Sequence, residues 1–253
     1  AALLASLLTL FSGFGLGTLL MPVIALFFPL PLAVAMTAVV HFANNLFKLA
    51  LLGRKANLRV LLRFGLPAML LALVGARLLT QLGGAEPLLD YELFGQRFVV
   101  VPLGLLIGML IIFFVALDLS PRASAVRIDP KWLPLGGAIS GFFGGLSGHQ
   151  GAFRSMFLLK TGLDKEAFVA TGIVLAVMVD TARLSIYGGS LLVTGNNINW
   201  WLVGAACLSA FLGAFVGRQL LKKVTFAFVQ LMVSVLLCLI GVGLMTGILR
   251  VAT

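Results

Sequence analysis

The stretch Ser140-Gly-Phe-Phe-Gly-Gly-Leu-Ser-Gly-His-Gln-Gly-Ala-Phe-Arg-Ser155 decides the fold, because glycines cluster here inside an otherwise apolar region. Glycine is unfavourable in a helix interior, since it adds backbone entropy to the unfolded chain. The same stretch carries His149, Gln150 and Arg154, which are costly in hydrocarbon and persist there mainly where they line a site or a path. We therefore predict that this stretch interrupts a membrane helix and forms half of an anion-binding site.

The composition around this stretch is that of a polytopic membrane protein. Of 253 residues, 61% are hydrophobic and only 10% are charged, which lies outside the range of soluble domains. The net charge of +10 comes mostly from basic residues in short loops, where they set membrane orientation, and this argues against nucleic acid as a partner. Cys207 and Cys238 lie inside apolar segments and predict no disulfide framework.

Apolar blocks follow one another along the whole chain and leave no room for a soluble domain. They cover residues 1–28, 32–52, 58–79, 98–117, 132–159, 168–187, 200–221 and 226–249. The first and fifth blocks are broken by glycines, and the longest loops lie near residues 80–97 and 118–131. Trp132, Tyr187, Trp200 and Trp201 stand at block ends, where aromatic side chains anchor helices at the membrane interface.

The two halves of the chain resemble each other. Ser12-Gly-Phe matches Ser140-Gly-Phe at the glycine breaks, and Ala35-Met-Thr37 resembles Val169-Ala-Thr171 in the following block. An internal duplication explains this similarity. We therefore expect one membrane domain made of a first repeat over residues 1–120, a linker over 121–131 and a second repeat over 132–253.

The basic residues favour one topology for the broken blocks. If all eight blocks cross the membrane, 8 basic residues lie on one side and 7 on the other. If both broken blocks are re-entrant hairpins, the split becomes 12 against 3, which the positive-inside rule prefers. The predicted fold is an all-α polytopic membrane protein with two inverted repeats, each a broken or re-entrant helical hairpin plus three transmembrane helices. A long tilted helix with a kink is the alternative for each broken block.

A returning hairpin helix places unpaired N–H groups and the positive end of its dipole near the bilayer midplane, where they attract anions. Arg154 adds a planar fork suited to an oxyanion. The predicted substrate-binding residues are Gly15, Gly17, Thr18, Asn44, Asn45, Lys48, Gly148, His149, Gln150, Gly151, Arg154 and Arg183.

Several polar residues in this set have structural alternatives. Arg154 can snorkel or pair with a carbonyl instead of binding a ligand, and His149 can be tied to a backbone carbonyl. His41, Asn44, Asn45 and Lys48 share one helical face, and this stripe can line a site or form an interhelical hydrogen-bond seam. Asp180 and Arg183 are spaced for an ion pair within one helix. A proton-coupling role for His149 or Asp180 is the second interpretation, because protons in membrane transporters pass along such buried groups.

No metal-binding, cofactor or nucleophile pattern accompanies these residues. We expect no enzyme activity and no cofactor, and we expect a small anion and the lipid bilayer as partners. A passive anion channel and an intramembrane enzyme using His149 and Asp180 are the competing hypotheses. The sequence leaves open whether the chain forms a homo-oligomer and, because it begins with Ala1, whether its N-terminus is complete.

The glycine breaks and the duplication resemble the sulfite exporter TauE/SafE family. Gly13-Phe-Gly-Leu-Gly17 with Pro22 is similar to the family's first glycine signature, Ala33-Val-Ala-Met-Thr37 to the helix that follows, and the 141–155 stretch with Glu166-Ala-Phe-Val-Ala-Thr171 to the second copy. This chain departs from the family pattern at Gly148-His-Gln-Gly-Ala-Phe-Arg-Ser155, which lacks the usual proline. The resemblance implies a secondary transporter of sulfite, organosulfonates or related sulfur anions in the bacterial inner membrane.

Overall fold

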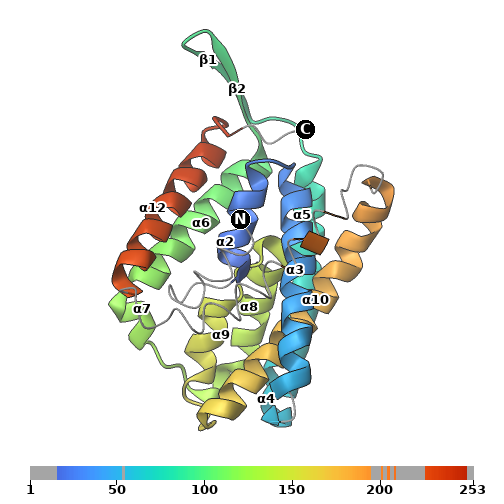
Figure 1. Ribbon diagram of the computed structural model, residues 1–253, viewed down its shortest axis with the longest axis vertical. Helices are drawn as coiled ribbons and strands as arrows, with labels where there is room; N and C mark the ends of the chain where they lie inside the picture. The colour runs from blue at the N-terminus through green and yellow to red at the C-terminus, as the bar shows by residue number, and fades with distance from the viewer. Residues whose placement is uncertain are drawn as a thin grey trace.

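The chain folds into a bundle of helices from which one β-hairpin projects (Figure 1). The computed structural model describes residues 16–52, 55–194, 201, 204, 205, 208 and 226–249. Its longer helices are α2 (Leu16–Ala25), α3 (Leu30–Leu52), α5 (Leu66–Gly83), α6 (Pro102–Leu119), α8 (Leu133–Ser147), α9 (Gly151–Leu158), α10 (Lys165–Thr194) and α12 (Phe226–Met245). Shorter pieces are α4 (Leu58–Val60), a π-helical turn η2 (Leu61–Gly65), α7 (Pro121–Ala125) and a 3-10 turn η3 (Pro130–Trp132).

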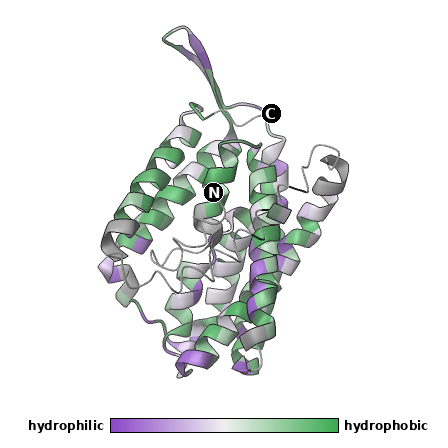
Figure 2. Ribbon diagram, in the orientation of Figure 1, coloured by the Kyte–Doolittle hydropathy of each residue, from purple (hydrophilic) through white to green (hydrophobic). Residues whose placement is uncertain are grey.

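Several of these helices can span a membrane. In the described residues, four helical segments are long and apolar enough by length and composition: Leu30–Ala50, Leu58–Gly83, Pro102–Leu119 and Lys165–Gly189. Figure 2 shows that apolar residues cover much of the helices, with hydrophilic residues gathered at helix ends and on the β-hairpin. Large apolar side chains are exposed along α5 (Leu66, Leu70, Val74) and α12 (Leu231, Val235, Leu239). Such continuous exposed apolar faces are typical of helices that contact lipid.

The β-hairpin is a feature that the sequence interpretation missed. Strands β1 (Leu89–Leu93) and β2 (Gln96–Val100) pair antiparallel, with Tyr91 opposite Phe98. The central turn residues Phe94 and Gly95 have φ of 53° and 72°, as a type I′ hairpin turn requires. The prediction of a helix from residue 98 was therefore wrong at its start, because β2 runs to Val100 and α6 begins only at Pro102. The Tyr91 hydroxyl donates to the Thr246 carbonyl at 2.6 Å and ties the hairpin to the end of α12.

The glycine-rich stretch forms a helical hairpin. Helix α8 ends at Gly148, which has a φ of 83° and donates its N–H to the Gly144 carbonyl. This left-handed conformation closes many helices and is strained for residues other than glycine. After the turn, α9 runs back along α8: a Cβ on Gly136 would strike the Phe157 ring, and the Ile128 N–H donates to the Met156 carbonyl at 3.2 Å. The segments that precede α8 and follow α9 therefore lie at the same end of the bundle.

Most glycines of α8 serve close packing against α5. A Cβ on Gly141 or Gly145 would overlap the carbonyl oxygen of Ala68 or Ala72 in α5, and a Cβ on Gly137 would overlap that of Phe64 in the adjoining turn η2. Because both positions advance by four residues from one contact to the next, α5 and α8 run parallel with their backbones in contact. Small residues at such spacing are a usual way for membrane helices to approach closely.

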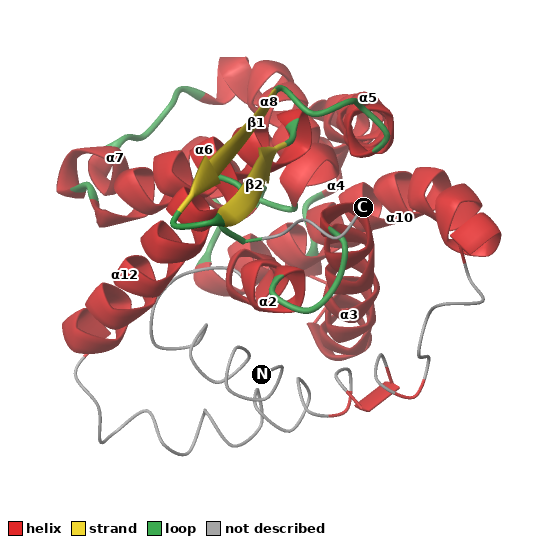
Figure 3. Cartoon of the chain, turned by 90° about the horizontal axis from the view of Figure 1, so that it is seen from above, coloured by secondary structure: helices red, strands yellow, loops and turns green. Residues whose placement is uncertain are grey.

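Two further helix pairs run antiparallel and surround this centre (Figures 1 and 3). In the first, α3 packs on α10, with His41 beside Asp180 and Lys55 paired with Glu166. In the second, α6 packs on α12: a Cβ on Gly108 would lie 2.5 Å from the Gly241 carbonyl oxygen, and the Gln230 side chain donates to the Asp118 carbonyl. The apolar core accordingly falls into a cluster centred on α3, α6 and α12 and another centred on α5, α8 and α10.

Candidate functional site

The site is built around the turn between α8 and α9. The first helical backbone bond that α9 receives joins the Arg154 N–H to the Gln150 carbonyl at 3.2 Å. The N–H groups of Gly151, Ala152 and Phe153 precede that bond, so they face outward from the helix start. His149 and Gln150, both buried, stand directly before them. The start of α9 therefore has the geometry of an anion-attracting helix N-terminus.

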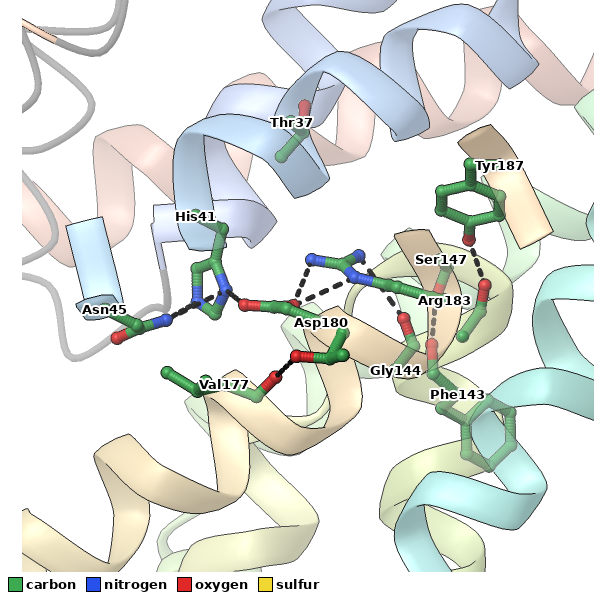
Figure 4. A network of polar contacts seen from close by, with 12 residues as sticks. Thr37, His41, Asn45, Phe143, Gly144, Ser147, Val177, Asp180, Arg183 and Tyr187 are labelled. Carbon is green, nitrogen blue, oxygen red and sulfur yellow. Dashed lines mark hydrogen bonds and ion pairs between the residues drawn. The ribbon is translucent and has the colours of Figure 1, made fainter. Parts of the chain in front are cut away.

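A buried carboxylate, Asp180, joins α3 to α10 next to this turn (Figure 4). His41 Nδ1 lies 2.6 Å from Asp180 Oδ2, while Arg183 Nε donates to Asp180 Oδ1 at 2.9 Å. The Asn45 amide nitrogen lies 3.1 Å from His41 Nδ1. The ion pair between Asp180 and Arg183 is thus present, and His41 and Asn45 belong to an interhelical hydrogen-bond seam. The ion pair and the hydrogen-bond seam are the structural roles that the sequence analysis gave as alternatives to substrate binding and proton coupling.

Side chains of helix α10 also donate hydrogen bonds to backbone carbonyl groups near the end of α8. Arg183 Nη1 donates to the Gly144 carbonyl at 3.3 Å, and the Tyr187 hydroxyl donates to the Gly145 carbonyl. The prediction that Tyr187 anchors the chain at the membrane interface was wrong, because this side chain is only 1% exposed. The physical reason is that α10 continues to Thr194, so Tyr187 lies inside the helix rather than at its end. Trp132 is exposed, as an interface anchor would be.

Apart from Arg183 Nη2, which lies 2.7 Å from Asp180 Oδ1, four buried polar atoms on α3, the turn and α9 have no hydrogen-bond partner within the described part of the chain. They are Asn44 Oδ1, His149 Nε2, Gln150 Nε2 and Arg154 Nη1. Buried polar groups are nearly always paired in folded proteins, and an orphaned one points to an unseen ligand, ion or water. His149 is held in place by stacking on Phe114 at 4.8 Å between ring centroids and by the Ser147 hydroxyl, 3.0 Å from Nδ1. Three of the four atoms are side-chain nitrogens, which suits a ligand rich in acceptors.

Arg154 and Lys48 approach the same part of α10 from α9 and α3. Arg154 Nε lies 3.7 Å from the position of a Cβ on Gly172, so its side chain lies against α10 at that glycine. In the sequence, Lys48 of α3 is midway between His41 and Lys55, which follows the end of α3. Ile173 is midway between their partners Asp180 and Glu166 on α10. The antiparallel register therefore places Lys48 level with Gly172 and Ile173, and Lys48 is within electrostatic range of Arg154.

The structure thus gathers many of the predicted ligands. Helices α3, α9 and α10 and the turn bring together Asn45, Lys48, Gly148, His149, Gln150, Gly151, Arg154 and Arg183, and Asn44 lies buried on α3. Gly17 and Thr18 belong to α2, and Gly15 lies outside the described residues. His41 was not among the predicted ligands, although its spacing from Asn45 and Lys48 already placed it on the same helical face. Its partner Asp180 is 139 residues away and has no local signal.

A metal site has no support in the part of the chain that the structure describes, where no three His, Cys, Asp or Glu side chains gather. The chemistry of the cluster is instead that of Lys48, Arg154 and Arg183 against the single carboxylate of Asp180. Such buried ionisable groups inside membrane-spanning segments usually mark a substrate or ion pathway.

Long apolar helices around a buried, cation-rich cluster at a hairpin turn define a multi-pass membrane protein of the transporter class. The chain matches the family described as Sulfite exporter TauE/SafE over residues 1–244 and belongs to that family. This is a transporter family and not a family of enzymes. No curated protein and no solved structure matches the chain.

Proposed function

We propose that this chain is a secondary transporter of a small anion, sulfite or a related sulfur oxyanion or organosulfonate. The observation that carries the proposal is the set of three cations, Lys48, Arg154 and Arg183, against the single carboxylate of Asp180, beside partnerless nitrogens at the start of α9. An anion placed there would meet N–H groups, the helix dipole and the Arg154 fork together. The family supports an anion of sulfur as the substrate class.

Inverted repeats explain the arrangement of the helices. By the sequence duplication, α3 and α10 are equivalent, as are α6 and α12, and each of these pairs runs antiparallel. Helices α2 and α9 run away from the middle of the bundle in opposite directions (Figure 1). Opposite directions for equivalent helices are what a two-fold axis in the membrane plane would produce. On this basis the repeats cover 1–120 and 132–253; the first glycine-rich break lies largely outside the described residues.

The hairpin topology also gives the orientation. Helix α9 returns to the end from which α8 starts, so the basic loops before α8 and after α9 lie together. Exposed basic residues at that end are Lys55, Arg59, Arg63, Arg122, Arg127, Lys131, Lys160 and Lys165. In the bacterial inner membrane this end would face the cytoplasm under the positive-inside rule. Alternating access would then expose the midplane site to one side at a time.

The test is anion uptake into proteoliposomes that contain the purified chain. Arg154→Ala removes the planar cation at the start of α9 and should abolish sulfite uptake, while Arg127→Ala, an exposed arginine outside the cluster, should leave it intact. Equal uptake by both variants would place the substrate site elsewhere. Accumulation of the anion against its own gradient would distinguish a transporter from a passive channel.

Proton coupling through Asp180 or His149 is a finer proposal for the same site. Asp180 already bonds to both His41 and Arg183, which favours a structural role, whereas His149 keeps a free ring nitrogen. If one of these residues carries the coupling proton, an imposed pH gradient should drive uptake in the wild type but not in the variant of that residue, Asp180→Asn or His149→Gln, compared at equal amounts of monodisperse protein. Identical pH-gradient responses in all three would rule out both residues as proton carriers.

A further inference from the structure

Few carboxylates lie near Lys48, Arg154 and Arg183, and the structure gives the position of every Asp and Glu in the chain. The chain has eight Asp and Glu residues, all within the described ranges. Six are exposed: Glu86, Asp90, Glu92, Asp129, Asp164 and Glu166. Asp118 lies at the far end of α6, beside α12. Asp180 is therefore the one fully buried carboxylate in the whole chain.

Asp180 is already paired. Its Oδ1 accepts from Arg183 Nε, with Arg183 Nη2 2.7 Å from the same oxygen, and its Oδ2 contacts His41. This pairing balances Arg183 with one negative charge. Asp180 also lies within electrostatic range of Arg154, so this single carboxylate faces the three cations Lys48, Arg154 and Arg183. Two like charges in a low-dielectric region repel strongly unless a counter-charge lies between them.

We propose that this site selects doubly charged oxyanions over singly charged ones, and that Lys48 is the residue that supplies this selectivity. The inference rests on the proposed function, since it concerns the same anion site. A doubly charged oxyanion between Lys48 and Arg154 neutralises both cations. A singly charged one leaves one cation uncompensated, which is costly inside the membrane.

The two cations have different tasks in this arrangement. Arg154 lies on α9, one turn from the unbonded N–H groups at the helix start, and presents a planar fork. It would bind any oxyanion, whatever its charge. Lys48 approaches from α3 as a compact point charge on a flexible stem, so its contribution follows the charge of the ligand rather than its shape. Removing Lys48 should therefore weaken divalent ligands selectively.

The experiment measures binding of anions whose charge does not change near neutral pH. Sulfate and thiosulfate serve as dianions and methanesulfonate as the monoanion, each titrated into the purified full-length chain at constant ionic strength. The thermal unfolding midpoint gives an apparent affinity for each anion, because a ligand that binds the folded state raises it by mass action. The variants are Lys48→Met, which keeps the apolar stem, and Lys48→Arg, which keeps the charge.

We expect the wild type to bind at least one of the dianions about tenfold more tightly than methanesulfonate, since an added unit charge at short range contributes on this order. Lys48→Met should lose that preference with little change for methanesulfonate, and Lys48→Arg should keep it. Equal affinities in the wild type, or an equal loss for all anions in Lys48→Met, would overturn the inference. If Lys48→Met does not fold, the dianion preference of the wild type and of Lys48→Arg still tests the inference.

The same titrations distinguish failure of this inference from failure of the proposed function. Stabilisation by methanesulfonate alone would leave an anion site intact and refute only the selection for double charge. Absence of stabilisation by every anion, including sulfite, would count against the anion site itself and hence against both proposals.

Discussion

The contact between α5 and α8 can be tested with a single methyl group. Gly141→Ala adds a Cβ that would overlap the Ala68 carbonyl oxygen and lie 2.6 Å from its carbonyl carbon. These are backbone atoms in the middle of a helix, so no side-chain rotation can relieve the overlap. The two helices must move apart, and the neighbouring contacts at Gly137 and Gly145 must loosen with them.

The expected cost follows from two opposing terms. Overpacking a close contact costs about 1–3 kcal/mol, and a clash with backbone belongs near the upper value. Alanine in place of glycine returns about 1 kcal/mol of helix propensity. The net loss is therefore about 2 kcal/mol, and for a chain of this size each kcal/mol shifts the unfolding midpoint by about 2–4 °C. We expect Gly141→Ala to lower the midpoint by about 4–8 °C.

The assay is thermal unfolding of the purified protein in detergent micelles, followed by the fraction that remains monodisperse. Gly189→Ala is the matched control, because Gly189 also lies in a helix but a Cβ there would meet no atom of the described residues within 4 Å. This control should be neutral or slightly stabilised. If Gly141→Ala proves as stable as Gly189→Ala, then α5 and α8 do not touch through their backbones and the reasoning fails.

The remaining predictions concern the contacts of α10. Tyr187→Phe removes the hydroxyl that bonds the Gly145 carbonyl and should cost about 1 kcal/mol, seen as a midpoint about 2–4 °C lower; an unchanged midpoint would show that this bond contributes nothing. Asp180→Asn leaves Arg183 buried without its counter-charge and should cost about 3–5 kcal/mol, seen as a sharp loss of monodisperse protein. The double variant Asp180→Leu with Arg183→Met should recover much of that yield, and a double variant no better than Asp180→Asn would contradict this account of the ion pair.

Local signals were enough for the main features of the second half. The apolar run and basic flanks predicted the α10 span, although α10 begins at Lys165 and ends at Thr194, beyond both predicted limits. The glycines and the distribution of basic residues favoured a turn near residue 148, where the structure has one. The spacing of Asp180 and Arg183 within one helix predicted their pairing. Each of these depends on residues close together in the sequence.

The features that were missed depend on neighbours far away in the sequence. His41 meets Asp180 across 139 residues, and Tyr187 reaches Gly145 across 42. The glycines from Gly141 onward were interpreted as a break in a helix, whereas Gly141 and Gly145 lie inside a continuous helix that packs on α5. Composition cannot separate these meanings, because a glycine that weakens an isolated helix also permits close backbone contact once a partner is present.

Helix α8 packs against different neighbours on two of its faces, and this packing bears on the proposed function. One face, with Gly137, Gly141 and Gly145, contacts η2 and α5, and the other, with Gly136 and Gly144, contacts Phe157, Gln150 and Val179 of the returning chain and α10. Arg183 and Tyr187 add bonds from α10 to the same hairpin, so α5, α8, α9 and α10 form one closely packed body. Asn44 and Lys48 lie outside this body, on α3, whose buried polar bond to it is His41 to Asp180. Under the proposed function, repulsion between Lys48 and Arg154 favours separation of α3 when the site is empty, and a bound anion removes that repulsion. Substrate charge would in this way control whether α3 closes on the site.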